Sequence, residues 1–351
     1  VLHNIYNIPK VVHPALVSRI KTMSRLDIAE RRRPQDGRFK TEFAGKEIEI
    51  RVSTVPVAFG EKVVLRIFDP EMMVHNLEDL GFFEEELNKY LRFISQPYGL
   101  ILVTGPTGSG KTTTLYSTLQ TLTSSELNIC TIEDPIEMVL DDLNQIAIQP
   151  KIGLSFAHAL RHVLRQDPDI IMVGEIRDSE TAQYAIQAAM TGHLVFSTLH
   201  TNDTASSIVR LIDLGIEPFQ VASTLIGVVA QRLLRKVCPD CREETILTSD
   251  QMEMLGIRLT DNENLRLKVY QGRGCPKCRS TGLWGRTGIF EVLEVTEKIR
   301  KLIIQRKSSK EIEKEAISDG MLTLRELAIK KLAKGITSFS EVIRVTNQEE
   351  L

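Results

Sequence analysis

The sequence has no strong excess of charge and no long apolar run, and each absence excludes a class of protein. Its 44 basic and 46 acidic side chains give a formal net charge of -2, so the chain as a whole is not attracted to DNA, RNA or anionic lipid. The longest apolar candidate, VASTLIGVVA at 221–230, is shorter than the ~18 to 20 residues of a membrane-spanning helix. We therefore expect no nucleic-acid partner, and contact with a membrane only through partner proteins.

Cysteines and targeting signals are also scarce. Five cysteines in 351 residues are too few for a disulfide scaffold. The first residues, VLHNIYNIPK, lack the basic and apolar regions of a signal peptide. Both features predict a reducing, cytoplasmic setting. The length exceeds the size at which a single hydrophobic core usually stops growing, so we expect two or three domains.

Residues 1–70 predict a small α+β module. A helix is expected from Pro14 toward Glu30, because apolar residues recur there at helical spacing and proline suits a first helical turn. KEIEIRVS alternates apolar and polar residues, as a half-buried strand does, and places Arg51 on its polar side. VVLRIF at 63–68 is a further strand candidate and contains Arg66.

Beyond a linker at 71–80, apolar strands alternate with helices, which is the pattern of a parallel α/β sheet. The strand candidates are LILVT at 100–104, NICTI at 128–132, IIMV at 170–173 and LVFST at 194–198. We expect an α/β core at 81–236, a cysteine-bearing element at 237–282 and a helical part at 283–351. Gly335 is the expected end of a helix in that last part.

A phosphate-binding loop follows the first of these strands. GPTGSGKT at 105–112 matches G-x-x-x-x-G-K-[ST] between an apolar strand and a helix. Its glycines let successive N–H groups converge on phosphate oxygens, Lys111 reaches the β and γ phosphates, and the Thr112 hydroxyl binds Mg²⁺. The sequence thus predicts ATP and Mg²⁺ as ligands. The expected ATP-binding residues are Gly105, Pro106, Thr107, Gly108, Ser109, Gly110, Lys111, Thr112 and Thr113.

Hydrolysis requires acids near the strand ends, and two boxes supply candidates. In DIIMVGEIRD, Glu175 follows an apolar strand and is our candidate for ordering the attacking water. In TIEDPIE, Glu133 is the candidate for the metal shell, whereas Glu137 fits a helix cap or a partner of an arginine better. His200 ends the strand LVFST, where ligands bind in parallel sheets, so it could contact the γ phosphate. For His193 a structural role and a sensor role stay equally open.

Four cysteines form two C-x-x-C pairs, Cys238 with Cys241 and Cys275 with Cys278, separated by 33 residues. Two such pairs can hold one Zn²⁺ in a closed four-thiolate site, which predicts a structural metal. The separation exceeds the 15 to 20 residues of the compact pattern, so the metal would pin a small insert. Disulfides are the alternative. Cys130 lies in a strand and is expected in the core.

Five boxes together resemble one family. GPTGSGKTTTLY, TIEDPIE, LRQDPDIIMVGEIRDSETAQ, TGHLVFSTLHTND and AQRLLRKVCPDC, in this order, are similar to the secretion ATPase superfamily that drives type II secretion and type IV pilus assembly. The resemblance implies a RecA-like P-loop ATPase domain after a PAS-like module, and a homo-hexamer. It further implies that ATP is bound between the module and the ATPase domain. Arg51 and Arg66 match the module's arginines that complete the site, and Arg177 and Arg286 match others around the nucleotide.

The resemblance also implies partners. The tetracysteine element is similar to that of assembly and secretion motors and is typically lacking in retraction ATPases. GIEPFQVASTLIGVVAQRL looks closer to type II secretion than to pilus assembly. The partner is then a platform protein, which would hold the chain at the inner membrane. Family members carry an N-terminal docking region and further strands before VLHNIY, so we expect the module to be incomplete here. The alternatives are a nucleic-acid motor and a scaffold that binds ATP without hydrolysing it.

Overall fold

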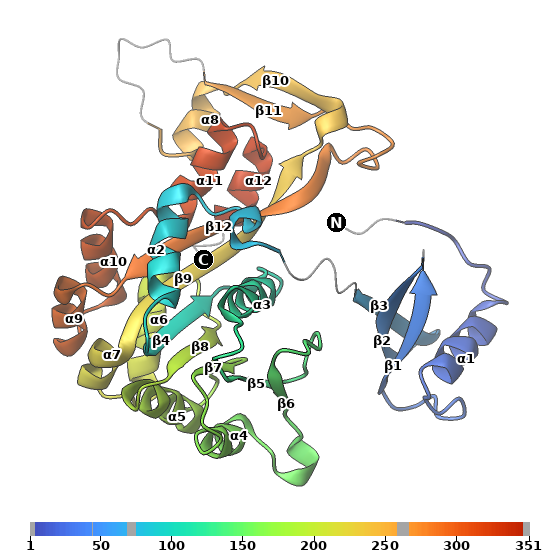
Figure 1. Ribbon diagram of the computed structural model, residues 1–351. Coiled ribbons are helices and arrows are strands. Elements are labelled where there is room, and N and C mark those ends of the chain that lie inside the picture. Colours follow the sequence, from blue (N-terminus) through green and yellow to red (C-terminus); the bar gives the residue numbers. More distant parts are fainter. Residues whose placement is uncertain (1–3, 44, 69–74, 258–266, 347–351) are drawn as a thin grey trace. The chain divides into compact units, whose positions relative to one another are not determined.

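A computed structural model describes residues 4–43, 45–68, 75–257 and 267–346. The chain divides into two compact units, Val1–Met73 and Val74–Leu351, and Figure 1 shows the elements of both.

The first unit is a three-stranded antiparallel sheet with one helix, which confirms the α+β expectation. Strands β1 (Gln35–Phe43), β2 (Lys46–Val57) and β3 (Gly60–Phe68) follow each other in space as in sequence. Helix α1 (His13–Met23) contacts β1 and β3. The prediction that this helix continues toward Glu30 is wrong, because Arg25 has a φ of 58° and takes the chain out of the helix.

The second unit contains a seven-stranded sheet in the order β12-β9-β4-β8-β7-β5-β6, in which only β12 is antiparallel to its neighbour. The four predicted strands are β4, β5, β7 and β8, so the parallel α/β class is confirmed. The strands are β4 (Gly99–Thr104), β5 (Ile129–Glu133), β6 (Asn144–Ala147), β7 (Ile170–Val173), β8 (Leu194–Leu199), β9 (Leu225–Val237) and β12 (Leu283–Glu294).

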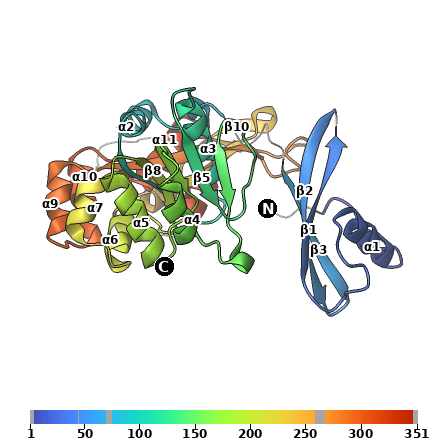
Figure 2. The same cartoon turned by 60° about the horizontal axis from the view of Figure 1, so that its bottom comes forward.

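Helices cover both faces of this sheet, as Figure 2 shows. Alternate residues of β4 divide the core: Ile101 and Val103 pack with α2 and α3, whereas Leu100 and Leu102 pack with α4 to α7, α9 and α10. The helices are α2 (Glu84–Ile94), α3 (Lys111–Leu122), α4 (Phe156–Val163), α5 (Ser179–Met190), α6 (Thr204–Asp213), α7 (Pro218–Thr224), α9 (Glu297–Ile304) and α10 (Ser309–Ser318).

A third apolar cluster joins the ends of β9 and β12 to the last helices, α11 (Leu324–Ala333) and α12 (Phe339–Thr346), and to α8 (Ser249–Met254). The small sheet of β10 (Arg242–Ile246) and β11 (Lys268–Gly272) lies next to it. Gly335 follows α11 with a φ of 67°, and its N–H bonds the Leu332 carbonyl at 2.8 Å. This confirms the predicted helix end.

The sequence pattern does not predict β9 or β12, and it assigns residues 283–351 to helices. Strand β12 is a correction to that assignment, because residues 283–294 pair with β9 in the main sheet. The domain boundaries at 70, 80, 236 and 282 stay predictions. No helix of the described residues is both long and apolar enough to cross a bilayer.

Candidate functional site

The phosphate loop lies between the carboxyl end of β4 and the amino end of α3. Gly105, Gly108 and Gly110 have φ values of 145°, 79° and 92°, in the left-handed region that glycine adopts without strain. Pro106, Thr107 and Gly108 are exposed at the tip, whereas Gly105 and Ser109 are buried. Thr112 and Thr113 occupy the first turn of α3, exposed and half-buried respectively. The loop therefore presents its tip and a helix N-terminus to solvent, as an anion site requires.

Lys111, the first residue of α3, folds back over this loop. Its Nζ donates to the carbonyl oxygens of Gly105 at 2.6 Å and Pro106 at 3.3 Å. Burial lowers the pKa of Lys111, Glu175 opposes the shift and Arg232 adds to it, and the resulting pKa is about 8. The charged form of Lys111 is thus less favoured than that of an exposed lysine. An anion on the loop would stabilise it.

Gln231 of β9 holds the loop from beneath, and sequence reasoning missed it. Its Nε2 donates to the Ser109 carbonyl at 2.8 Å, and its Oε1 accepts from the Thr114 hydroxyl at 2.8 Å. A side chain at Gly110 would lie 2.8 Å from that Nε2, and one at Gly105 would lie 2.5 Å from the Gln231 carbonyl oxygen. Both glycines are therefore required by the close approach of this buried residue, as well as by their φ values.

Three predicted residues meet at the ends of β7 and β8. Glu175 forms an ion pair with Arg177, and its Oε2 lies 3.2 Å from His200 Nε2. The Glu175 side chain is 12% exposed, whereas those of Arg177 and His200 are 65% and 51% exposed. The hydrogen bond to Glu175 raises the pKa of Arg177. Because β4, β8 and β7 are adjacent parallel strands, the phosphate loop, His200 and Glu175 lie at the same edge of the sheet, and the Glu175 carboxylate favours the charged form of Lys111.

Glu133 is held differently from Glu175. It is buried at the end of β5 and accepts hydrogen bonds from Tyr116 at 2.5 Å, Thr131 at 2.6 Å and Gln145 at 3.1 Å. Burial and the Glu133 carboxylate raise the pKa of Tyr116, so this phenol stays a donor. The carboxylate therefore ties α3, β5 and β6 together. A role in the metal shell stays a prediction.

The histidine at the other end of β8, His193, contacts the end of α5. His193 Nδ1 lies 2.9 Å from the carbonyl oxygen of Ala188 and 3.1 Å from the Thr191 hydroxyl. Both partners belong to the end of α5 and the turn after it. Of the two roles left open for His193, these contacts support the structural one.

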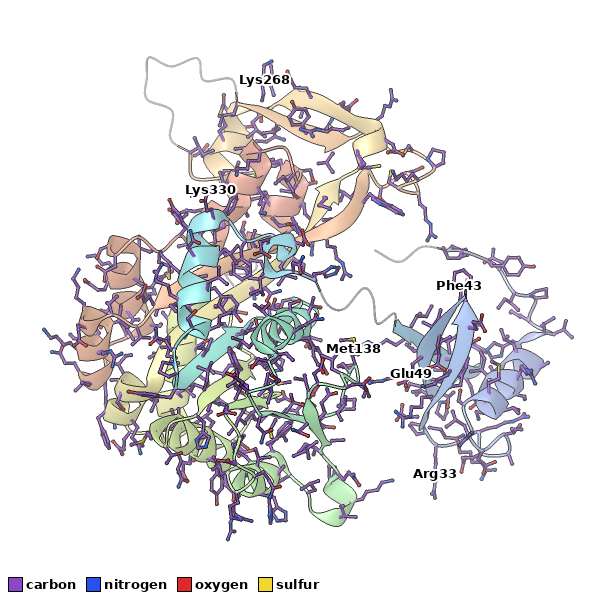
Figure 3. All side chains as sticks on the ribbon, in the orientation of Figure 1. Arg33, Phe43, Glu49, Met138, Lys268 and Lys330 are labelled. Carbon is purple, nitrogen blue, oxygen red and sulfur yellow. The ribbon has the colours of Figure 1, made fainter. Side chains whose placement is uncertain are left out.

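The predicted arginines of the first unit lie in one row across its sheet. Arg51 of β2 is opposite Arg66 of β3 and also opposite Arg38 of β1, so the three side chains share a face. Glu49 lies 3.5 Å from Arg51 and 3.8 Å from Arg38, and Figure 3 labels it among the side chains of this sheet. Sequence reasoning missed Arg38, whose register with Arg51 follows only from the strand pairing. In the second unit, Arg286 is exposed on β12, opposite Arg235 of β9.

The four predicted cysteines come together. Their sulfur atoms all lie within 4.8 Å of one another, and Cys238–Cys275, Cys241–Cys278 and Cys275–Cys278 are 3.8, 3.8 and 3.6 Å apart. A tetrahedral Zn²⁺ with Zn–S bonds of about 2.3 Å separates its sulfurs by about 3.8 Å, so the cluster fits this ion. All five cysteines are free thiols, which argues against the disulfide alternative. Cys130 is buried in β5, as expected.

Backbone N–H groups also favour thiolates in this cluster. Cys278 Sγ accepts from the N–H groups of Cys275 at 3.1 Å and Gly282 at 3.2 Å, and Cys241 Sγ accepts from that of Gly274 at 3.3 Å. Burial opposes the charge on Cys278, but these donors and the thiols of Cys275 and Cys241 outweigh it and lower the pKa of Cys278 to about 6. Burial outweighs the single N–H donor at Cys241 and raises the pKa of that thiol to about 12. A thiolate is the form that binds a metal.

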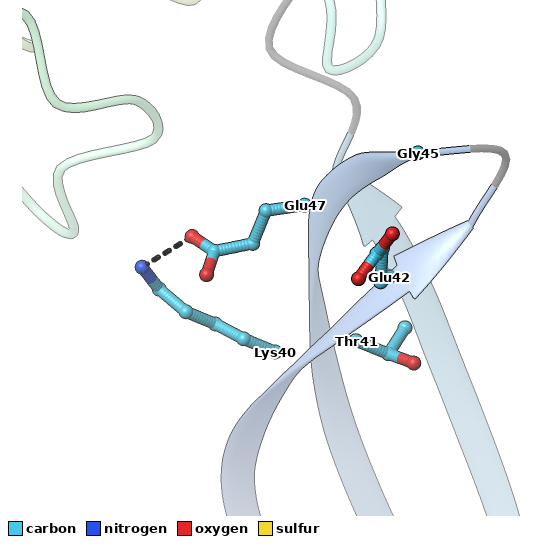
Figure 4. A pocket seen from close by; sticks show the side chains of 5 residues that line it. All are labelled: Lys40, Thr41, Glu42, Gly45 and Glu47. Carbon is cyan, nitrogen blue, oxygen red and sulfur yellow. Dashed lines mark hydrogen bonds and ion pairs between the residues drawn. The ribbon is translucent and has the colours of Figure 1, made fainter.

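A hollow at the tip of the β1–β2 hairpin is not a comparable site. It is lined by Lys40, Thr41, Glu42, Gly45 and Glu47 (Figure 4). Its ion pair, Lys40–Glu47 at 2.7 Å, has side chains 63% and 67% exposed, and such pairs stabilise little. None of the five lining residues is buried. No ligand site follows from it.

The sequence matches the family model described as "Type II/IV secretion system protein" over residues 1–344. It is 48% identical over 348 residues to the type IV pilus assembly ATPase TfpB of Acinetobacter baylyi, covering 98% of this chain and 59% of that protein. It is 47% identical over 333 residues to the type II secretion system ATPase E of Vibrio cholerae, covering 95% of this chain and 65% of that protein. The chain thus spans about three fifths of the length of these relatives.

Solved structures agree on the fold. The pilus retraction motor PilT with bound ADP is 28% identical, with a TM-score of 0.62 over 91% of this chain and 80% of that one. The ATPase DotB of Legionella pneumophila has a TM-score of 0.70 over 98% of this chain and 86% of that one, at 20% identity. At that identity the likeness supports the fold alone.

Proposed function

Since the chain belongs to the type II/IV secretion system protein family, we propose that it is an ATP-hydrolysing motor that assembles a filament of pilin-like subunits. The observation that carries this proposal is the placement of the phosphate loop after β4 and of Glu175 after β7 at the same edge of the sheet. Following the family resemblance, the working form is a homo-hexamer. It acts on a platform protein and is held by it at the cytoplasmic side of the inner membrane.

In the proposed reaction, water attacks the γ phosphate in line with the leaving ADP oxygen. Glu175 orients this water and His200 holds the Glu175 carboxylate, at 3.2 Å. Lys111 and the loop N–H groups stabilise the charge that develops on the phosphate oxygens. The Thr112 hydroxyl would bind Mg²⁺, which supplies further positive charge. Arg177 releases its ion pair with Glu175 when that carboxylate turns toward the water.

Two substitutions test this assignment in a phosphate-release assay. We expect Lys111→Ala to abolish ATP binding or turnover. Glu175→Gln should keep ATP binding and lose turnover, because the amide cannot accept the water's proton. Glu126→Gln, in an exposed loop, is the matched control. Normal turnover in Glu175→Gln would refute the assignment, and absence of turnover in the unmodified protein would favour an ATP-binding scaffold. Stimulation by single-stranded DNA would favour a nucleic-acid motor.

Arg51, Arg66 and Arg286 are proposed as cations that contact the nucleotide phosphates, on the family resemblance. The shared row of Arg51 and Arg66 concentrates positive charge on one face of the small sheet, which supports this role. Mixing Arg51→Ala subunits with Lys111→Ala subunits tests whether Arg51 acts on a neighbour's site. Recovery of activity in mixed rings is expected, and mixtures as inactive as either parent would contradict it.

Zn²⁺ is the proposed metal of the four-cysteine cluster, in a structural role, because four thiols leave no open position for a substrate. We favour type II secretion over pilus assembly on the run GIEPFQVASTLIGVVAQRL. The relatives of the two kinds are 47% and 48% identical, so overall identity does not separate them. Complementation of strains that lack one or the other ATPase separates the two pathways.

A further inference from the structure

Lysine side chains surround one aromatic ring at the start of α2. The Nζ atoms of Lys331, Lys334 and Lys330 lie 4.7, 4.9 and 5.6 Å from the centre of the Phe83 ring. All three come from the end of α11 or the residue that follows it. Figure 3 labels Lys330 on this helix. Three ammonium groups thus gather around a ring that can favour each of them only weakly.

The lysine at the centre of this group is buried. Lys331 is 5% exposed, and its Nζ reaches the Thr287 hydroxyl of β12 at 3.5 Å. Burial lowers the pKa of Lys331 to about 8, with further contributions from the charges of Lys334 and Lys236. Lys236, at the end of β9, is a fourth cation, two residues beyond Leu234, which is the strand partner of Thr287. Its side chain lies beside Gly285, where a Cβ would be 3.8 Å from its Nζ.

Acidic partners are missing from this cluster. In the ranges 4–43, 45–68, 75–257 and 267–346, none of the four lysines forms an ion pair with a carboxylate. Lys298 shows the usual arrangement, with Glu315 at 3.1 Å and Asp319 at 2.6 Å. The end of α11 favours positive charge through its helix dipole. That dipole accounts for one or two exposed lysines, and it does not account for four converging cations of which one is buried.

We propose that Lys236, Lys330, Lys331 and Lys334, grouped around Phe83, form a binding site for a phosphate-bearing anion. A phosphate group offers several acceptor oxygens and up to two negative charges, and lysines bind it as point charges. The Thr287 hydroxyl supplies a further donor beside Lys331. The ligand is either a free phosphate compound or the headgroup of an anionic lipid. This site is separate from the phosphate loop and does not depend on ATP hydrolysis.

The test uses the full chain carrying Lys111→Ala, so that the phosphate loop contributes least. Pyrophosphate is titrated by calorimetry in one arm. In the other arm the protein is sedimented with phosphatidylglycerol vesicles, and phosphatidylcholine vesicles are the control. We expect binding in at least one arm. The double variant Lys236→Gln/Lys334→Gln, at two exposed positions, should weaken it at least about tenfold, because two unit charges next to the anion are removed.

Lys301→Gln is the matched control, since Lys301 is exposed in the last turn of α9. It should leave binding unchanged. Loss in the pyrophosphate arm identifies a free phosphate ligand, and loss in the vesicle arm alone identifies a lipid headgroup. Two results would overturn the proposal: binding in neither arm, or binding that the double variant and the Lys301 control retain equally. For Lys331→Gln the melting temperature is measured together with binding, because Lys331 is buried and its substitution can also destabilise the fold.

Discussion

The pKa of Lys111 makes a quantitative prediction about nucleotide binding. Lys111 has a pKa of about 8 in this structure because it is buried, with Arg232 adding to the effect and Glu175 opposing it. Phosphate oxygens beside the ammonium favour the charged form, so the pKa of Lys111 rises when a nucleotide binds. Nucleotide binding is then accompanied by uptake of a proton wherever Lys111 is neutral in the nucleotide-free protein. Nucleotide affinity should therefore be highest below about pH 7 and should fall as the pH rises through the pKa that Lys111 has in the nucleotide-free protein.

The size of the effect follows from the charged fraction. For a group with a pKa of about 8, that fraction falls about tenfold between about pH 7 and about pH 9. We expect the dissociation constant of ADP or ATP to rise about tenfold over this range. The terminal phosphate of the nucleotide does not contribute above about pH 8, because its own pKa is about 6.

Calorimetry at about pH 8.5 measures the proton directly, by comparing the binding heat in two buffers with different ionisation enthalpies. Lys111→Arg is the matched variant, because a guanidinium stays charged over the whole range; any affinity that it retains should not depend on pH. Arg232→Gln removes a neighbouring positive charge, so it should move the transition to higher pH. An affinity that is constant between about pH 7 and about pH 9, with no proton uptake, would refute the reasoning.

Three further predictions concern the elements around the site. Gln231→Leu should raise the dissociation constant for a fluorescent nucleotide about tenfold, since the Ser109 carbonyl and the Thr114 hydroxyl lose their partner. Thr114→Val breaks only one of these contacts and should raise the dissociation constant less. Equal nucleotide affinity of the unmodified protein and both variants would contradict the role of Gln231 in holding the loop. Glu341 is fully buried and pairs with Arg235 and Arg344. Although burial opposes its charge, the two arginines lower the pKa of Glu341 to about 2. Glu341→Gln should lower the free energy of unfolding, measured by chemical denaturation, by about 2 kcal/mol. This is less than the loss expected on breaking a fully buried ion pair, because both arginines are partly exposed. The stability that Glu341 contributes should be present above about pH 5 and lost toward about pH 2. If the unmodified protein and Glu341→Gln differ in free energy of unfolding by the same amount at both pH values, this prediction is wrong. Metal analysis should give one zinc per chain, and removing it with a chelator or with Cys278→Ser should lower the melting temperature; a metal-free protein with an unchanged melting temperature would refute the zinc assignment.

Local signals explain the parts of the fold that the sequence predicts. The strands β4, β5, β7 and β8 are short apolar runs with helices between them, and the phosphate loop follows a fixed spacing of glycines. The length of α1 is overestimated for the same reason, because the apolar spacing continues past Met23. The positive φ of Arg25, which ends the helix, has no signal in the sequence. The strand β12 contains GRTG at 285–288, close to its start, and this run looks like a loop because glycine is rare within strands.

Non-local contacts explain most of what the sequence does not predict. Glu133 has the position of a metal ligand after a strand, but its three donors come from α3, β5 and β6. Nothing in TIEDPIE indicates Tyr116 or Gln145. Arg38 is similar, because only the register of β1 on β2 places it beside Arg51. By contrast, Glu175 and His200 follow neighbouring strands, so the end of the sheet brings them together as the sequence predicts.

The strand β9 shows why the phosphate loop cannot be considered by itself. No turn residue separates α7 from β9, so the segment looks like one apolar run with polar interruptions at Gln231 and Arg232. In the structure both polar residues make specific contacts. Gln231 holds the phosphate loop, and Arg232 donates to the carbonyl of Asn202, two residues beyond His200, at 3.0 Å. Farther along, Arg235 pairs with α12, and Cys238 follows the strand directly. The phosphate loop, α12 and the four-cysteine cluster are therefore all attached to this one strand, through Gln231, Arg235 and Cys238.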